Sequence, residues 1–255
     1  MKKKLLLSAL LTLSAVVLVV ATVLTTIAFL AHQASVTNTF TMGNVLIHLY
    51  ESKVNENGEK ITNDDGSFKD ENGDQMKDSI GNSYKISPNG SYDKDPTVYV
   101  MPESDECILF VQVQNGIREV EAPAVEGVYT QMADQMKANG WHRVGRNALG
   151  NVYVYAGKDV DVQYPADKHG VVVADTNSMQ KFDLFTNFKI KDNATREGVE
   201  GKTLIVNAYA IQEESFATTT TEGVKYLTKE NVHSAWNALV GNFDTALELI
   251  PEEQN

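Results

Sequence analysis

Cysteine, proline and basic residues are all scarce in this chain of 255 residues, which contains one cysteine (Cys107) and six prolines. A lone cysteine cannot form a disulfide within the chain, so a disulfide-stapled framework is excluded. The 17 glycines and six prolines are too few for a collagen-like or low-complexity protein. Basic residues number 22 against 34 acidic ones, which gives a formal charge of −12. Because such an acidic chain repels phosphate backbones, we expect no nucleic-acid partner.

Catalytic motifs are also absent from the sequence. It contains no H-E-x-x-H and no two histidines four residues apart, so the local arrangement of a zinc peptidase is missing. No G-x-S-x-G elbow occurs either. We therefore predict no catalytic residues, no resident metal or cofactor, and a protein that is not an enzyme. A metal site assembled from histidines far apart in the chain stays open, and the candidates are His32, His48, His142, His169 and His233.

The N-terminus has the pattern of an export signal. A basic n-region at residues 2–4 precedes an uncharged, mainly apolar run at residues 5–30. This run reaches the ~20 residues that a membrane helix needs, so a retained anchor and a cleaved signal both stay open. The small-x-small triplet that ends at Ala28 favours cleavage before Phe29. We expect a signal peptide over residues 1–28, membrane contact only through an uncleaved leader, and a secreted or surface-bound product.

Residues 29–255 contain no linker that would divide them, and we interpret them as one domain. Their apolar residues alternate as in half-buried strands. The main strand candidates lie at residues 45–50, 97–101, 106–114, 141–144, 151–155, 182–190 and 203–211. In the candidate at 182–190, the alternation slips at Leu184-Phe185, which predicts a β-bulge.

Helical spacing is found twice in this domain. Tyr129, Met132, Ala133 and Met136 share one helical face that Gly140 closes, and a second helix runs from an N-cap at Thr228 to a stop at Gly241. Many strands and two short helices predict a mainly β fold. We expect an antiparallel, jelly-roll-like β-sandwich, preceded by the N-terminal signal helix.

The segment 51–95 differs from the rest of the domain because it is polar, acidic and rich in Asn-Gly and Asp-Gly turn signals. We expect either an extended, solvated excursion with short hairpins or a disordered segment. Asp70, Asn72 and Asp74 alternate as at the start of a calcium loop, although the sixth and twelfth positions lack the required Gly and Glu. They are weak calcium candidates, and a solvated charged turn is the alternative.

Three stretches together resemble a group of exported Gram-positive proteins. The leader ends in TTIAF, and residues 37–45 read Thr-Asn-Thr-Phe-Thr-Met-Gly-Asn-Val. Residues 94–98 read Lys-Asp-Pro-Thr-Val, and residues 208–212 read Ala-Tyr-Ala-Ile-Gln. These stretches are similar to the signal and strands of proteins processed by the SipW-type signal peptidase, a family that includes TasA-like biofilm fibre proteins and camelysin. The sequence departs from that pattern at Leu30-Ala31, where polar residues are usual.

The resemblance implies a jelly-roll sandwich and, as in TasA-like members, a structural role in the extracellular matrix or at the cell surface. Cleavage would free residues 29–40, a β-prone segment that includes Phe29, Val36 and Phe40. We expect this segment to add to a sheet edge of a second copy. The implied partners are a SipW-type signal peptidase, further copies of the chain and other matrix proteins. A camelysin-like metallopeptidase and a monomeric surface adhesin or ligand-binding module remain as alternatives.

Overall fold

The computed structural model describes residues 40–42, 45–61, 81–158, 168–173, 179–216 and 218–240. All of these residues belong to the second of two compact units, Met1–Val36 and Thr37–Asn255. The expected signal helix and the calcium candidates lie outside the described residues. Within the described part, no helix is long and apolar enough to span a membrane.

The described chain is mainly β, and all its strand pairs are antiparallel except the pair of β1 with β11. The strands are β1 Phe40–Met42, β2 Ile47–Tyr50, β3 Ser91–Asp93, β4 Thr97–Val100, β5 Cys107–Asn115, β6 Trp141–Asn147, β7 Gly150–Tyr155, β8 Gly170–Val173, β9 Gln180–Asp183, β10 Asn187–Lys189, β11 Leu204–Gln212, β12 Thr218–Thr221 and β13 Val224–Leu227. The helices are α2 Met132–Ala138, α3 Arg196–Val199 and α4 Lys229–Val240, with a 3₁₀ turn at Glu213–Ser215.

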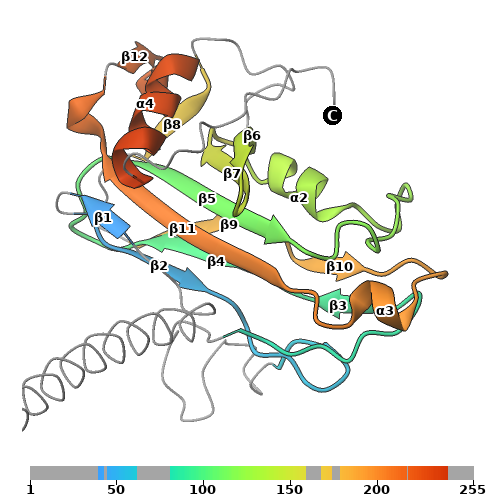
Figure 1. Ribbon diagram of the computed structural model, residues 1–255. Coiled ribbons are helices and arrows are strands. Elements are labelled where there is room, and N and C mark those ends of the chain that lie inside the picture. Colours follow the sequence, from blue (N-terminus) through green and yellow to red (C-terminus); the bar gives the residue numbers. More distant parts are fainter. Residues whose placement is uncertain are drawn as a thin grey trace, which may run out of the picture. The chain divides into compact units, whose positions relative to one another are not determined.

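Three sheets are formed by these strands. The largest has eight strands in the order β1-β11-β5-β8-β13-β12, and the β6–β7 hairpin joins it through the pairing of β7 with β5. A second sheet has the order β2-β4-β9, and a third contains β10 and β3. The two longest strands, β5 and β11, run side by side through the centre of the large sheet (Figure 1).

Strand β5 separates two hydrophobic cores because both of its faces are buried. Cys107, Leu109 and Val111 face a core that also contains side chains of β2, β4, β9 and α2. Ile108 and Phe110 face the opposite way, into a core that α4 covers. The first of these cores is shared by two sheets, as expected for layered β packing.

Most of the expected strands are confirmed, and the alternation of buried and exposed side chains explains why these residues form strands. Val45, Ile47 and Leu49 are buried, while the intervening Leu46 is 53% exposed. Every second residue of β11 faces the first core, with Ala208 and Ala210 fully buried. The alternation around β2 is that of a strand with one buried face, whereas in β11 the intervening Tyr209 and Ile211 are buried in the second core.

The expected single strand at residues 182–190 is wrong. The chain instead forms β9, which pairs with β4, and β10, which pairs with β3 in a different sheet. Between them Leu184 and Phe185 are both fully buried, and the Leu184 N–H donates to the Pro96 carbonyl at 3.0 Å. The slip in alternation therefore marks a change of sheet rather than a bulge within one strand.

Both expected helices are present. Helix α4 begins after Thr228, whose hydroxyl accepts a hydrogen bond from the Asn231 N–H at 3.3 Å, as an N-cap does. Helix α2 is followed by Gly140 at φ +89°, the left-handed position that favours glycine. Met132 and Met136 are buried, but Ala133 is exposed, contrary to expectation. The short helix α3 has no counterpart among the elements expected from the sequence.

Candidate functional site

The edge of the eight-stranded sheet at β1 is the part of the described structure that bears most directly on the expected assembly segment. Phe40, Thr41 and Met42 lie in parallel register with Tyr209, Ala210 and Ile211 of β11. Among the described strands, β1 pairs with β11 alone. An outermost strand leaves one row of backbone N–H and C=O groups without a partner in its own sheet, which makes it a template for a further strand.

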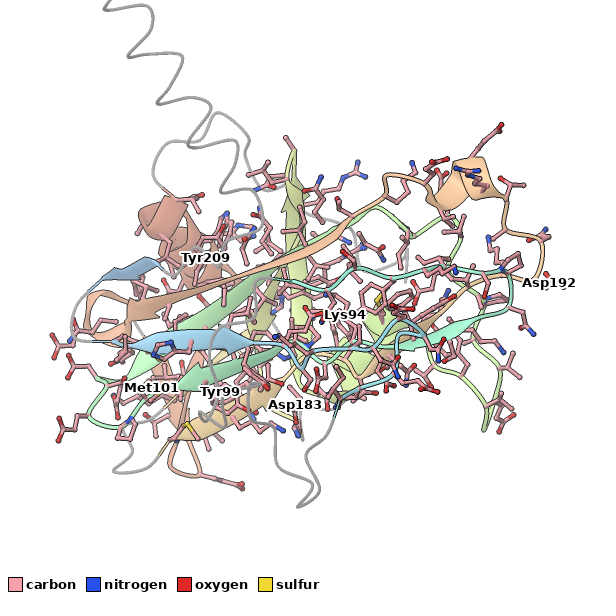
Figure 2. All side chains as sticks on the ribbon, turned by 90° about the horizontal axis from the view of Figure 1, so that it is seen from below. Lys94, Tyr99, Met101, Asp183, Asp192 and Tyr209 are labelled. Atoms are coloured by element: carbon pink, nitrogen blue, oxygen red, sulfur yellow. The ribbon has the colours of Figure 1, made fainter. Side chains whose placement is uncertain are left out.

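Strand β11, the neighbour of β1 in the sheet, is anchored by side-chain contacts to β5 and α4. Tyr209, labelled in Figure 2, is 7% exposed, and its ring meets Trp236 of α4 edge-on with centroids 5.2 Å apart. The Tyr209 hydroxyl donates to Gln112 Oε1 of β5 at 3.3 Å. Burial raises the pKa of Tyr209, so the phenol stays neutral. Strand β1 is therefore paired with a strand whose Tyr209 contacts both the neighbouring strand β5 and helix α4.

The opposite edge of the same sheet is β12, which consists of four threonines. It pairs with β13 through a turn at Glu222 and Gly223, both at positive φ, as in the tight turn of a β-hairpin. Thr219 and Thr220 are exposed. The strand contains neither lysine nor proline, the residues that commonly block association at sheet edges. Among the described strands, β1 and β12 are therefore two edges of the large sheet suited to strand addition, while β6, which pairs only with β7, is a third edge.

The residues expected to carry function lie mainly outside the described residues. This holds for Ala28 and Phe29 at the expected cleavage site, for Val36, and for the calcium candidates Asp70, Asn72 and Asp74. Phe40 is placed by its backbone at the start of β1.

Three of the five histidines come from distant parts of the chain to one region. The rings of His142 on β6 and His169 before β8 meet edge to face with centroids 5.1 Å apart, and His169 also acts electrostatically on His233 of α4. Burial, followed by the nearby charge of His169, lowers the pKa of His142 to about 3, and burial also lowers the pKa of His233. The Nε2 atom of His233 is buried without a hydrogen-bond partner. Within the described ranges, no group of three or more His, Cys, Asp or Glu residues is arranged to hold a metal ion.

A polar network ties together the two described arms of the 51–95 segment. Glu51, just after β2, accepts hydrogen bonds from Lys94 Nζ at 2.5 Å and from Asn82 Nδ2 at 2.7 Å. Asp95 accepts hydrogen bonds from the N–H and hydroxyl of Ser52 at 2.9 and 2.8 Å and pairs with Lys60 Nζ at 2.6 Å. Sequence reasoning missed this network because its members lie up to 43 positions apart and belong to no local motif.

Cys107 and Tyr153 are buried side chains within strands and pack in the interior of the domain. Cys107 is fully buried, and burial raises the pKa of its thiol to about 12, so it lacks the thiolate character of a nucleophile. Tyr153 on β7 is 6% exposed, and burial raises its pKa as well. Neither side chain presents a reactive group to solvent.

No family model, no curated protein and no solved structure matches this chain.

Proposed function

We propose that this chain is an exported structural protein of the cell surface or biofilm matrix. In this proposal a SipW-type signal peptidase cuts between Ala28 and Phe29, and the released protein polymerises by adding its N-terminal segment to a sheet of a second copy. Two features support it: the resemblance of the leader and residues 37–45 to SipW-dependent proteins, and the position of β1. The observation that carries the assembly step is the parallel pairing of Phe40–Met42 on the outer side of β11.

Strand addition fits this position for a physical reason. Residues 29–39 directly precede β1, whose pairing covers only Tyr209–Ile211 of β11. Among the described strands, residues 204–208 of β11 therefore have no strand paired to them on this side, which leaves an open stretch of edge. Main-chain hydrogen bonds to an open edge supply affinity without a dedicated pocket. When one copy donates its N-terminus and accepts a segment at a different place, the contact is head-to-tail and does not close. The product is then a fibre.

We also propose that the domain is a jelly-roll-like β-sandwich. The support for this finer fold is the first core, which side chains of the eight-stranded sheet and of the β2-β4-β9 sheet share. In addition to the two sheets of such a sandwich, helix α4 packs on the other face of the large sheet.

Negative-stain electron microscopy tests the proposed function. Purified residues 29–255 at neutral pH are expected to form filaments whose amount rises with protein concentration. Residues 41–255, which lack the expected donor segment, are expected to remain monomeric under the same conditions. A variant of residues 29–255 with Phe29 and Val36 both changed to Asp is a matched control, because it keeps the length but replaces two apolar side chains by charges. Persistent monomers of residues 29–255 would contradict fibre formation, and filaments of residues 41–255 would contradict the N-terminal mechanism.

Two assays on the same preparation separate the alternatives. A camelysin-like metallopeptidase predicts proteolysis that a chelator abolishes, together with near-stoichiometric zinc. A calcium-dependent surface module predicts a rise in melting temperature with calcium that is lost in Asp70→Asn and Asp74→Asn variants. The structural proposal expects neither effect.

A further inference from the structure

An amine, an amide and one carboxylate are brought together at the base of the 51–95 segment. Lys94 Nζ donates to Glu51 Oε2 at 2.5 Å, and Asn82 Nδ2 donates to Glu51 Oε1 at 2.7 Å. The two nitrogen atoms are thus bound to the two oxygens of the same side chain. The Asn82 carbonyl oxygen, Oδ1, accepts a hydrogen bond from the Val54 N–H at 3.1 Å. Both polar atoms of the Asn82 side-chain amide are therefore hydrogen-bonded, which fixes the orientation of the amide group.

Lys94 and Glu51 are largely shielded from water, and Asn82 is half-buried. Lys94, labelled in Figure 2 between β3 and β4, is 5% exposed, and the Glu51 side chain is 12% exposed. The backbone N–H of Lys94 donates to the Thr186 carbonyl at 3.0 Å. Tyr84 lies beside the site, and its single hydroxyl proton has two acceptors in range, the Asp93 carbonyl at 2.9 Å and Glu51 Oε1 at 3.3 Å.

Aromatic packing holds the Tyr84 ring in place. The Tyr84 ring meets the rings of Tyr92 and Phe188 edge-on, with centroids 6.0 and 5.2 Å away. Burial, with the Glu51 carboxylate nearby, raises the pKa of Tyr84, so the hydroxyl remains a hydrogen-bond donor. In such a setting, passing a proton from an ammonium to a carboxylate removes two buried charges at once, which lowers the cost of forming the neutral amine.

We propose that Lys94 and Asn82 become joined by an isopeptide bond that the folded protein forms on itself. Glu51 takes a proton from the Lys94 ammonium, and the neutral Nζ attacks Cγ of Asn82. The Val54 N–H donates to the oxygen on which negative charge develops, as in an oxyanion hole. Glu51 then delivers its proton to Nδ2, the Cγ–Nδ2 bond breaks, and ammonia leaves. Glu51 takes the second proton from Nζ as the new amide forms and passes it to the ammonia, which departs as ammonium. A C–N bond forms and a C–N bond breaks, Glu51 returns to the carboxylate, and no oxidant or reductant takes part.

The two-sided contact of Glu51 favours this chemistry over a simple ion pair. A carboxylate that only neutralised Lys94 would have no need to bind the amide nitrogen on its other oxygen. Here one oxygen touches the atom that must lose a proton and the other touches the atom that must gain one. Both contacts are ones that a group acting as base and then as acid in an acyl transfer needs. The proposal goes beyond the assembly function and does not depend on it.

The product would close a covalent loop between residues 82 and 94, which lie on the return arm of the segment. The loop contains β3 and the turn at Asn89, which has φ +60°. A link of this kind limits the conformations of the unfolded chain, as a disulfide does, but it resists reduction. A protein with one buried cysteine has no disulfide to serve this purpose.

Peptide mapping of the full-length chain tests the proposal. Trypsin does not cleave at a lysine whose amine is acylated, so the peptide of residues 78–85 should appear joined to residues 86–118 with Lys94 uncut. The mass of that product should equal the sum of the two peptides less one ammonia. Fragmentation in tandem mass spectrometry should place the link between Asn82 and Lys94.

Three variants make the test specific. Lys94→Arg keeps the positive charge beside Glu51 but removes the ε-amine that would form the bond. The linked peptide should therefore disappear. Glu51→Gln keeps the side chain's size but removes the proton acceptor, and it should reduce the linked fraction at least tenfold. Lys60→Arg is the matched control because Lys60 pairs with Asp95 in the same network, and the link should be unchanged.

Circular dichroism of each variant establishes that it folds before the comparison is made. Full-length protein that is folded yet yields residues 78–85 and residues 86–94 as separate, unmodified peptides would overturn the proposal and leave an ion pair only. A linked peptide that persists in Lys94→Arg would overturn it as well, because the loss of ammonia would then arise elsewhere.

Discussion

The imidazole rings of His142 and His169 meet edge to face with their centroids 5.1 Å apart, so one contact joins β6 to the chain that enters β8. The charges that act on His142 come from several elements: His169 across the contact, Lys137 of α2, Lys229 of α4 and Arg143 of its own strand. All of them are basic. Together with burial, they make a protonated His142 unfavourable in the folded protein.

The first prediction is a loss of stability in mild acid. The pKa of His142 is about 3 in the folded state against an ordinary value of 6.5, so the unfolded chain binds this proton first as the pH falls. Its contribution is fully present above pH 6.5 and is lost progressively between pH 6.5 and pH 3. Each pKa unit corresponds to ~1.4 kcal/mol. Thermal midpoints measured across this range should fall, and His142→Gln should flatten the fall.

A control for this experiment is His48→Gln, because His48 is exposed on β2. The pH profile of this variant should follow that of the unmodified chain. An unaltered profile in His142→Gln would show that other groups dominate the acid sensitivity.

The second prediction concerns Trp236, the aromatic anchor of α4. It is 2% exposed, and its ring lies 5.5 Å from that of Phe110 and 5.2 Å from that of Tyr209. Replacing a buried Trp by Ala costs about 3–5 kcal/mol because it removes apolar contact and leaves a cavity. Urea denaturation of Trp236→Ala should show this loss. Asn237→Ala, at an exposed position of the same helix, should change the free energy of unfolding by less than about 0.5 kcal/mol.

The third prediction concerns Glu121, a carboxylate that is 5% exposed. It accepts a hydrogen bond from the Tyr129 hydroxyl at 2.7 Å. It also accepts one at 2.8 Å from the N–H of Met132, which is the first residue of α2. Glu121→Ala leaves both donors without this acceptor and should lower the free energy of unfolding by about 1–3 kcal/mol. Urea denaturation measures the loss, and Glu119→Ala at an exposed position is the matched control. Equal stability of the two variants would contradict a structural role for the Glu121 carboxylate.

The fourth prediction is that the only thiol of the chain is inert in the native state. Cys107 is fully buried at the start of β5, and burial raises its pKa to about 12. Iodoacetamide at pH 8 should therefore leave it unmodified in the folded protein and alkylate it rapidly after unfolding in guanidinium. Mass spectrometry of the intact chain measures the modification. Rapid labelling of the folded protein would show that β5 opens locally.

Local rules are enough to predict the elements that have one buried face and clear ends. The alternation of Val45, Ile47 and Leu49 and the N-cap at Thr228 are local signals, and the structure confirms both. The β6–β7 hairpin follows for the same reason. Each of these features depends on residues within a few positions of one another, where geometry is set by backbone periodicity and capping.

Features that depend on distant contacts could not be predicted in this way. The fully buried pair Leu184 and Phe185 disturbs the alternation, but only the carbonyl of Pro96 and the second sheet decide that the chain changes sheets there. Likewise, no pattern in the sequence reveals that Glu51 binds both Asn82 and Lys94, because 31 and 43 positions separate them. Helix α3 is four residues long and carries no apolar periodicity.

The pairing of β5 with β11 also determines when the protein can fold. Gln112 and Tyr209, which are bonded across these two central strands, stand 97 positions apart in the chain. Contacts between such distant residues form slowly because a long loop must close first. During synthesis, β5 leaves the ribosome long before its partner has been translated. The nascent chain therefore stays without its central strand pair until nearly the whole domain has emerged.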